Sequence, residues 1–303
     1  MMTTSNDYRI PCPYCSHESF LLSKAKDRNR KITDHSFSYY RCKSCGLVFL
    51  NPVPDDIDQY YPDNYYHIPT STDFLSETAP GEQHKLDQII RFKDSGRLLE
   101  IGPSTGTFAW ISKQHGYEVQ TIEMDAQCSN YLNNVAGIPT INTADTCGAL
   151  FTLDPFDVIV MWQVIEHLPS PWETLRSVSE KVKLGGIVVL AAPNPSSFGF
   201  RLLGKNWPHL DAPRHLRLIP MQLLEQWMSD LGFIKEFETT NDHASKQWNT
   251  FSWYYTLRNS KWLAWMSDSL SQKFGHWISK LASPWERMEG NGATYTMVFR
   301  KHN

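Results

Sequence analysis

The chain has 303 residues, of which 41% are apolar and 20% are charged, and this ordinary globular composition excludes wholesale disorder. No apolar run approaches the roughly 18 residues that a membrane-spanning helix needs, and no apolar leader precedes Cys12, so we expect a cytoplasmic protein without a transmembrane segment. Residues 1–50 hold 8 basic against 4 acidic side chains, residues 51–245 hold 13 against 25 and residues 246–303 hold 8 against 3; the acidic middle argues against a nucleic-acid partner.

Two pairs of cysteines stand near the N-terminus, Cys12 with Cys15 and Cys42 with Cys45. Two residues between thiolates let one turn aim both sulfurs at a single ion, so the pairs predict a closed structural zinc site. A redox dithiol is the alternative, although that motif comes singly beside a strand–helix–strand unit. The 26 residues between the pairs suffice for a hairpin, and residues 1–52 are predicted to form a zinc-ribbon-like module.

The segment between the cysteine pairs is basic, with Lys24, Lys26, Arg28, Arg30 and Lys31. We interpret it as a solvated hairpin loop, and a phosphate-contacting tip is the alternative. Residues 53–92 are predicted to be a linker and a helical segment. The four tyrosines between residues 60 and 66 are interpreted as simple packing residues.

From residue 93 onward, strand patterns alternate with helix patterns. The predicted strands are Arg97–Ile101, Glu118–Glu123, Phe156–Val164, Ile187–Ala192, Ile234–Thr239 and Thr294–Arg300. The predicted helices are Phe108–His115, Ala126–Val135, Ser170–Lys183 and Met221–Leu231. This alternation predicts a parallel sheet with helices on both faces, so residues 93–303 are expected to form one α/β domain. Ligands of such sheets bind at the carboxyl ends of the strands.

Glycines and acids stand at those carboxyl ends. The first strand runs into Glu100-Ile-Gly-Pro-Ser-Thr-Gly106, and the second ends at Glu123, where a carboxylate suits a ribose diol. The other motifs in the same order are Phe156-Asp-Val-Ile-Val, Glu166-His167-Leu168, Leu184-Gly185-Gly186 and Pro193-Asn194. Together these motifs resemble the class I S-adenosylmethionine-dependent methyltransferases, and more narrowly the bacterial group with an N-terminal zinc-binding module. The resemblance implies a Rossmann-like fold with a mostly parallel seven-stranded sheet.

The resemblance also implies where the methionine half of the cofactor binds. Glu100, Gly102 and Gly106 would cradle it, and Ser104 stands where the family often has a third glycine.

The same resemblance implies that other residues bind the adenosine half and lie at the reactive centre. Glu123 would hold the ribose hydroxyls, and Met124 would cover the adenine. Asp145 would reach the adenine amino group, and Gln163 would lie beside the methyl sulfonium.

A polar cluster follows the predicted strand Ile187–Ala192, with His209, Asp211, Arg214 and His215. We predict that His215 is a general base, because histidine titrates near neutral pH, and that His209 or Arg214 recognises an anionic or hydroxylated substrate. His167 is a second catalytic candidate. The alternative for both catalytic candidates is packing within a turn.

Residues 242–290 are predicted to be a helical insertion before the last strand. Its apolar residues recur about four apart, at Trp262, Met266, Leu270, Phe274, Ile278 and Leu281. We interpret the insertion as a lid over the substrate pocket. Peripheral membrane contact through residues 251–283 is the alternative.

These patterns favour an S-adenosylmethionine-dependent methyltransferase that acts on a small molecule. The expected substrates are a sugar or a lipid-linked glycan of surface polysaccharide or natural-product biosynthesis. An RNA methyltransferase that uses the zinc module for recognition, and a non-catalytic cofactor-binding module, are the alternatives.

Overall fold

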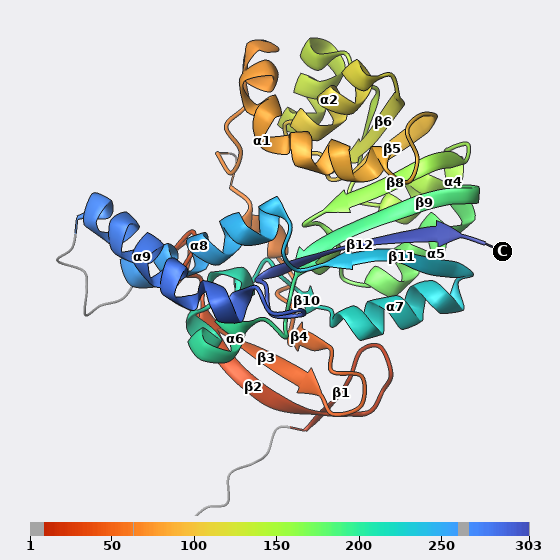
Figure 1. Ribbon diagram of the computed structural model, residues 1–303. Helices are drawn as coiled ribbons and strands as arrows, with labels where there is room; N and C mark the ends of the chain where they lie inside the picture. The colour runs from red at the N-terminus through yellow and green to blue at the C-terminus, as the bar shows by residue number, and fades with distance from the viewer. Residues whose placement is uncertain (1–8, 63, 260–266, 303) are drawn as a thin grey trace, which may run out of the picture.

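A computed structural model describes residues 9–62, 64–259 and 267–302, which form two sheets and their helices (Figure 1). The strands are β1 (Ile10–Pro11), β2 (Glu18–Lys26), β3 (Ser36–Cys42), β4 (Val48–Leu50), β5 (Arg97–Ile101), β6 (Glu118–Glu123), β7 (Thr140–Asn142), β8 (Phe156–Trp162), β9 (Val182–Pro193), β10 (Arg217–Leu218), β11 (Phe233–Thr239) and β12 (Thr294–Lys301). The helices are α1 (Asp73–Ile90), α2 (Thr107–His115), α3 (Ala126–Tyr131), α4 (Thr146–Thr152), α5 (Pro171–Lys181), α6 (Phe198–Leu203), α7 (Met221–Asp230), α8 (His243–Arg258) and α9 (Asp268–Glu286).

The larger sheet has seven strands in the order β11-β12-β9-β8-β5-β6-β7. β12 runs antiparallel to both of its neighbours, and the strands from β9 to β7 are mutually parallel. The predicted Rossmann-like, mostly parallel seven-stranded sheet is therefore confirmed. Alternate residues of β8 enter different core clusters, Val158 on one face and Ile159 on the other, so the strand is buried on both faces.

Two predicted boundaries are wrong in detail. The structure places Gly185 and Gly186 inside β9, which begins at Val182, and Gly185 takes a left-handed φ of 75° where the pairing with β8 shifts register. A glycine pair can break a helix or accommodate a strand irregularity, and here it does the second. The helix predicted over 126–135 is α-helical only to Tyr131 and continues as a π turn.

The smaller sheet joins the N-terminal module to the body. Its order is β1-β2-β3-β4-β10, so the fifth strand, Arg217–Leu218, comes from the body and pairs with β4. The hairpin β2–β3 lies at the bottom of Figure 1, beneath the larger sheet. The proposed division at residue 52 therefore crosses a shared sheet, and the division into 1–52, 53–92 and 93–303 stays a prediction.

The insertion before β12 forms two packed helices, α8 and α9, at the left of Figure 1. Trp262 and Met266 of the predicted stripe lie outside the described residues. Within the described part of the chain, no helix has the length and apolar character needed to cross a membrane.

Candidate active site

A cavity of about 240 Å³ lies at the carboxyl end of β5, and Glu100, Gly102 and Ser104 line it. Gly102 and Gly106 have φ of 71° and 78°, and a Cβ on Gly102 would lie 2.6 Å from Val164. Glycine is required at such positions because other residues would be strained and would clash. Gly106 also caps the start of α2. The loop therefore brings backbone close to the cavity, as the resemblance implied.

Glu100 is an acidic side chain beneath this loop. It is 3% exposed, and its Oε2 has no hydrogen-bond partner. Burial raises the pKa of Glu100 to about 8. An unpartnered buried carboxyl is suited to an incoming ammonium group, so Glu100 fits the amino group of a bound methionine moiety.

Ser104 adopts the backbone that a glycine would supply, with φ of 54°. Its backbone N–H donates to Oε2 of Glu123 at 2.9 Å, and the N–H of Asp125 donates to Oε1 at 2.8 Å. Glu123 thus ties the loop after β5 to the end of β6. Each oxygen retains a lone pair for a ribose hydroxyl.

The remaining cofactor candidates differ in how the structure places them. Met124 follows Glu123 and is 53% exposed. Asp145 caps α4 by accepting from the N–H of Gly148, and its adenine contact stays a prediction. Asn142 lies closer to the Glu123 region, because its side chain donates to the carbonyl oxygens of Glu123 and Met124.

Gln163 lies where two cavities meet. A cavity of about 100 Å³ shares Trp162 with the cofactor cavity and Gln163 with a larger cavity of about 380 Å³. Gln163 follows β8 with a left-handed φ of 57°. That Gln163 lies beside the reactive centre stays a prediction, which this position between two cavities allows.

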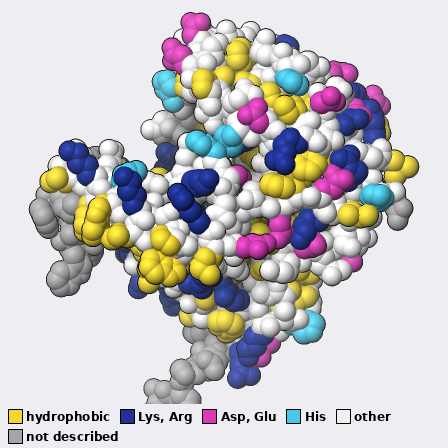
Figure 2. All heavy atoms as spheres, in the orientation of Figure 1, with side chains coloured by type: hydrophobic (Ala, Val, Ile, Leu, Met, Phe, Trp, Pro, Cys, Tyr) yellow, Lys and Arg dark blue, Asp and Glu magenta, His cyan; other side chains and the backbone are white. Residues whose placement is uncertain are grey.

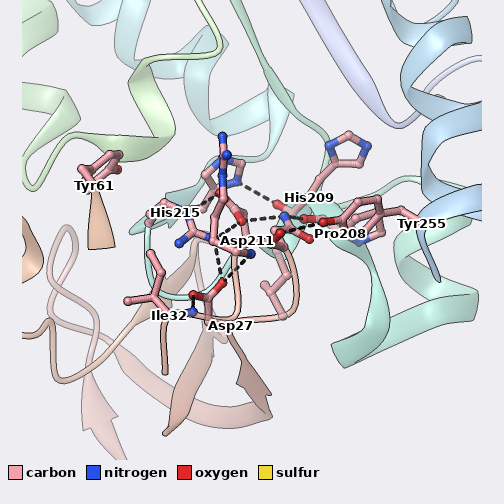
Figure 3. A network of polar contacts seen from close by, with 12 residues as sticks. Asp27, Ile32, Tyr61, Pro208, His209, Asp211, His215 and Tyr255 are labelled. Carbon is pink, nitrogen blue, oxygen red and sulfur yellow. Dashed lines mark hydrogen bonds and ion pairs between the residues drawn. The ribbon is translucent and has the colours of Figure 1, made fainter. Parts of the chain in front are cut away.

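The larger cavity is built from four distant parts of the chain: the β2–β3 hairpin, the segment around Tyr65, the turn after β8 and the 208–215 loop, with α8 on one side. Aromatic side chains supply much of its wall, namely Tyr65, Trp248, Phe251 and Tyr255. Figure 3 shows His209, Asp211 and His215 together above Asp27 of the hairpin. α8 therefore forms one wall of this cavity, and no described residue of α9 lines it; the interpretation of the insertion as a lid stays a prediction.

His215 is the best-placed proton acceptor in the larger cavity. Its Nδ1 lies 2.8 Å from the carbonyl oxygen of His209, which can only accept, so Nδ1 carries the hydrogen and Nε2 is free to accept. Burial lowers the pKa of His215 to about 3. Nε2 lies 3.9 Å from a carboxylate oxygen of Asp211, which would stabilise an imidazolium.

The other two histidines are held in a similar way. Nδ1 of His167 lies 3.0 Å from the carbonyl oxygen of Arg214 and 3.0 Å from the hydroxyl of Tyr61, and its ring centroid lies 4.6 Å from that of His215. His209 contacts the carbonyl oxygen of Trp248 at 3.3 Å, and burial lowers its pKa to about 4. Both are neutral, and both line the larger cavity.

Glu166 completes this group. It is 1% exposed and neither of its carboxyl oxygens has a hydrogen-bond partner, so burial raises its pKa to about 8. One ligand atom from each of Glu166, His167 and His215 lies within 4.8 Å of the others, a spacing that a metal ion could also use.

Exchanging Glu166 for glutamine should stabilise the cofactor-free protein at high pH. The raised pKa of Glu166 means that its contribution to stability is full below about pH 4.5 and is lost as the pH rises through about 8. Glutamine does not titrate, so the variant should keep stability that the wild type loses. Between pH 5 and pH 9, the free energy of unfolding should fall by roughly 2 to 4 kcal/mol less in the variant than in the wild type. Urea unfolding at both pH values measures this. The exposed Glu118→Gln is the control, and an equal effect of Glu166→Gln at both pH values would contradict the assignment.

Arg214 lies behind the cavity wall and not in it. Its side chain is fully buried and pairs with Asp27 at 2.8 Å and Asp211 at 2.6 Å. These charge-assisted bonds keep Asp211 ionised, with a lowered pKa despite burial. Direct substrate binding by Arg214 stays a prediction; the observed contacts make it a residue that positions Asp211 and the hairpin.

The sequence interpretation missed the contribution of the hairpin. Arg30 was assigned to a solvated loop, but it lines the larger cavity with its guanidinium 4.2 Å from the ring centre of Tyr65. Asn29 donates to the carbonyl oxygen of Pro208 and to Asp211, and accepts from the hydroxyl of Tyr255 through its own carbonyl. The asparagine within the basic run was the available signal for a structured tip.

The four cysteines converge at the other end of the module. Their sulfur atoms lie 3.7 Å apart for Cys12 and Cys45, 3.5 Å for Cys15 and Cys42, and 3.6 Å for Cys15 and Cys45. A tetrahedral zinc with Zn–S bonds of about 2.3 Å spaces its sulfurs at about 3.8 Å, so the donor set fits this metal. Burial opposes ionisation of Cys42, but N–H groups of Cys45 and Ser44 bring its pKa down to about 7.

Comparison with known proteins agrees with the fold. A family model described as "Methyltransferase domain" matches residues 77–235, which is slightly more than half of the chain. The chain belongs to this methyltransferase family, and it is an S-adenosylmethionine-dependent methyltransferase.

Individual relatives are distant. A ubiquinone biosynthesis O-methyltransferase of Leptothrix cholodnii is 25% identical over 174 residues, covering 52% of this chain and 72% of the relative. The enzyme of the same name from Saccharophagus degradans is 24% identical over 169 residues, covering 52% and 71%. A solved S-adenosylmethionine-dependent methyltransferase from Archaeoglobus fulgidus is 20% identical, covers 75% of this chain and 99% of its own, and superposes with a TM-score of 0.51. At that identity, the structural likeness establishes the fold alone.

Proposed function

We propose that the protein methylates a hydroxyl group of a small molecule bound in the larger cavity. The observation that carries this proposal is the neutral His215, whose Nε2 is free to accept a proton inside a cavity that meets the cofactor side at Gln163. The relatives named ubiquinone biosynthesis O-methyltransferase support oxygen as the acceptor atom.

The cofactor residues act by positioning. When bound, S-adenosylmethionine supplies an electrophilic methyl group. Glu100, Gly102, Ser104 and Gly106 hold its methionine half, in agreement with the unpartnered carboxyl of Glu100. Glu123 holds the ribose, with Met124 and Asp145 toward the adenine.

Residues of the protein then remove the proton from the substrate hydroxyl that accepts the methyl group. Nε2 of His215 takes it from the substrate hydroxyl, and Asp211 stabilises the imidazolium that forms. Because burial lowers the pKa of His215 to about 3, the ring is neutral throughout the physiological range, and its protonation depends on the stabilisation that Asp211 supplies. His167 packs edge-on against His215 and fixes its orientation, and His209 offers its free ring nitrogen to a substrate hydroxyl.

The walls of the larger cavity suit a ring-shaped substrate. Aromatic side chains present flat apolar faces, and Arg30 adds a cation at the rim. A sugar or a lipid-linked glycan of surface polysaccharide or natural-product biosynthesis has the required hydroxyls and ring faces. The position of Asn29 and Arg30 at this cavity favours a small molecule over RNA recognition by the module. A lipid-linked substrate would bring residues 251–283 close to a membrane.

Cys12, Cys15, Cys42 and Cys45 hold a structural zinc ion in this proposal. Four thiolates leave no open position, so the metal supports folding and takes no part in methyl transfer.

Loss of His215 tests the proposed chemistry. We expect His215→Ala to lower turnover roughly 10²- to 10⁴-fold, because a positioned general base contributes about that much. Release of S-adenosylhomocysteine is measured with a panel of sugars, lipid-linked sugars and phenols. Cofactor affinity should stay within twofold, and the exposed His115→Ala is the control. Full turnover by His215→Ala would remove the base assignment while leaving the methyltransferase assignment intact.

A further inference from the structure

Helix α9 packs on the body through small side chains. Its buried positions include Ser271, Gly275, Ser279 and Ala282, which recur every three or four residues along one face. A Cβ on Gly275 would lie 2.5 Å from Cα of Tyr254 on α8, so the two helices are in close contact. The inward face is therefore filled mainly by small side chains, with Ile278 half-buried beside them.

Five large apolar side chains of α9 point outward. Leu270, Phe274, Trp277, Leu281 and Trp285 are exposed by 50%, 40%, 55%, 53% and 54%. At about 100° per residue, these five positions fall within an arc of about 80°, which makes one continuous stripe. A stripe of this size is normally buried, because each such side chain gains roughly 1.5 to 3 kcal/mol from full burial.

Positive charge borders the apolar stripe on one side. Lys273, Lys280 and Arg287 are exposed and fall about 80° to 120° from the middle of the stripe. Figure 2 shows dark blue basic side chains beside the yellow apolar patch at the α9 end of the molecule. Glu286, the acidic side chain described within α9, points inward, where it is 3% exposed and accepts from Nε1 of Trp253 at 2.7 Å.

We propose that this outer face of α9 lies on the surface of a membrane that contains anionic lipids. Tryptophan and phenylalanine side chains would enter the headgroup region, while the flanking basic side chains reach the lipid phosphates. A second copy of the chain suits this face less well, because a twofold contact would bring lysines toward lysines. The stripe is also separate from the lid, since α8 supplies the helical wall of the larger cavity.

Vesicle flotation of the full-length protein tests the proposal independently of any methyl transfer. We expect the protein to float with vesicles of phosphatidylcholine and phosphatidylglycerol, and at least tenfold less with phosphatidylcholine alone. The double change Phe274→Ser and Trp277→Ser should lower the floating fraction at least tenfold, since these two stacked rings are exposed and their loss leaves the core unchanged. Lys273→Glu with Lys280→Glu should abolish the preference for phosphatidylglycerol.

A matched control removes exposed apolar groups elsewhere. Phe151 and Leu184 are 80% and 73% exposed near α4 and the start of β9, at the other end of the molecule in Figure 1. The double change Phe151→Ser and Leu184→Ser should leave flotation unchanged. The proposal is overturned if the wild type stays unbound to anionic vesicles, or if both double variants lose flotation equally. It is also overturned if light scattering finds a dimer that the α9 variant dissociates while vesicle binding is absent.

Discussion

Replacing Glu123 with alanine weakens the binding of S-adenosylmethionine at least a hundredfold. The wild-type carboxylate offers charge-assisted hydrogen bonds to two ribose hydroxyls, and it also receives the N–H groups of Ser104 and Asp125. Loss of about 3 kcal/mol, a modest estimate for two such bonds, corresponds to a factor of roughly one hundred. Isothermal calorimetry with the cofactor and with S-adenosylhomocysteine measures the change.

The same strand supplies the control for this experiment. Glu118 begins β6, and its exposed carboxylate lies 3.3 Å from Arg97, the first residue of β5. Both residues lie at the amino ends of these strands, away from the cavity. Glu118→Ala should leave the affinity unchanged within about twofold, because exposed ion pairs contribute little. An affinity for Glu123→Ala within threefold of the wild type would show that Glu123 does not contact the ribose.

Replacing Cys45 with serine should remove the proposed zinc ion from the four-cysteine cluster and destabilise the whole protein. Zinc content should fall from about one ion per chain to near zero, because a closed site needs all four thiolates. The effect should extend beyond the module, since β4 pairs with β10 and Asp27 is ion-paired with Arg214. We expect the melting temperature to fall by more than about 10 °C, as for loss of a structural metal.

Cys147 provides the matched substitution. It is half-buried, lies outside the cluster and makes a weak contact with Thr174, so Cys147→Ser should change the melting temperature by about 2 °C or less. If Cys45→Ser fails to accumulate, treating the wild type with a strong chelator and restoring zinc should lower and recover its melting temperature. A wild-type protein that is fully stable and free of zinc would contradict the assignment.

The sheet could be predicted from the sequence because its strands carry local signals. Arg97–Ile101 and Glu118–Glu123 were predicted with their observed bounds, since apolar runs ending in an acid and a turn mark both. The spacing of the cysteines likewise predicted that Cys12, Cys15, Cys42 and Cys45 lie together. Gly185 shows the limit, because a positive φ inside an irregular strand and a helix stop have the same sequence signature.

The larger cavity could not be predicted in full because distant segments build it. Asn29 and Pro208 are 179 positions apart and are joined by a hydrogen bond that no local pattern signals. A charged loop such as that around Arg30 is usually solvated, and only the docking of the module makes it a cavity wall. Helix periodicity identified the stripe through Phe274, but periodicity alone does not say which face meets the body.

The structure of the protein with bound S-adenosylhomocysteine tests the cofactor assignment most directly. We expect the ribose hydroxyls at Glu123, the amino group at Glu100 and the sulfur directed past Gln163 toward His215. A ligand bound away from the loop between Glu100 and Gly106, or no binding at millimolar concentration in a folded protein, would contradict the assignment.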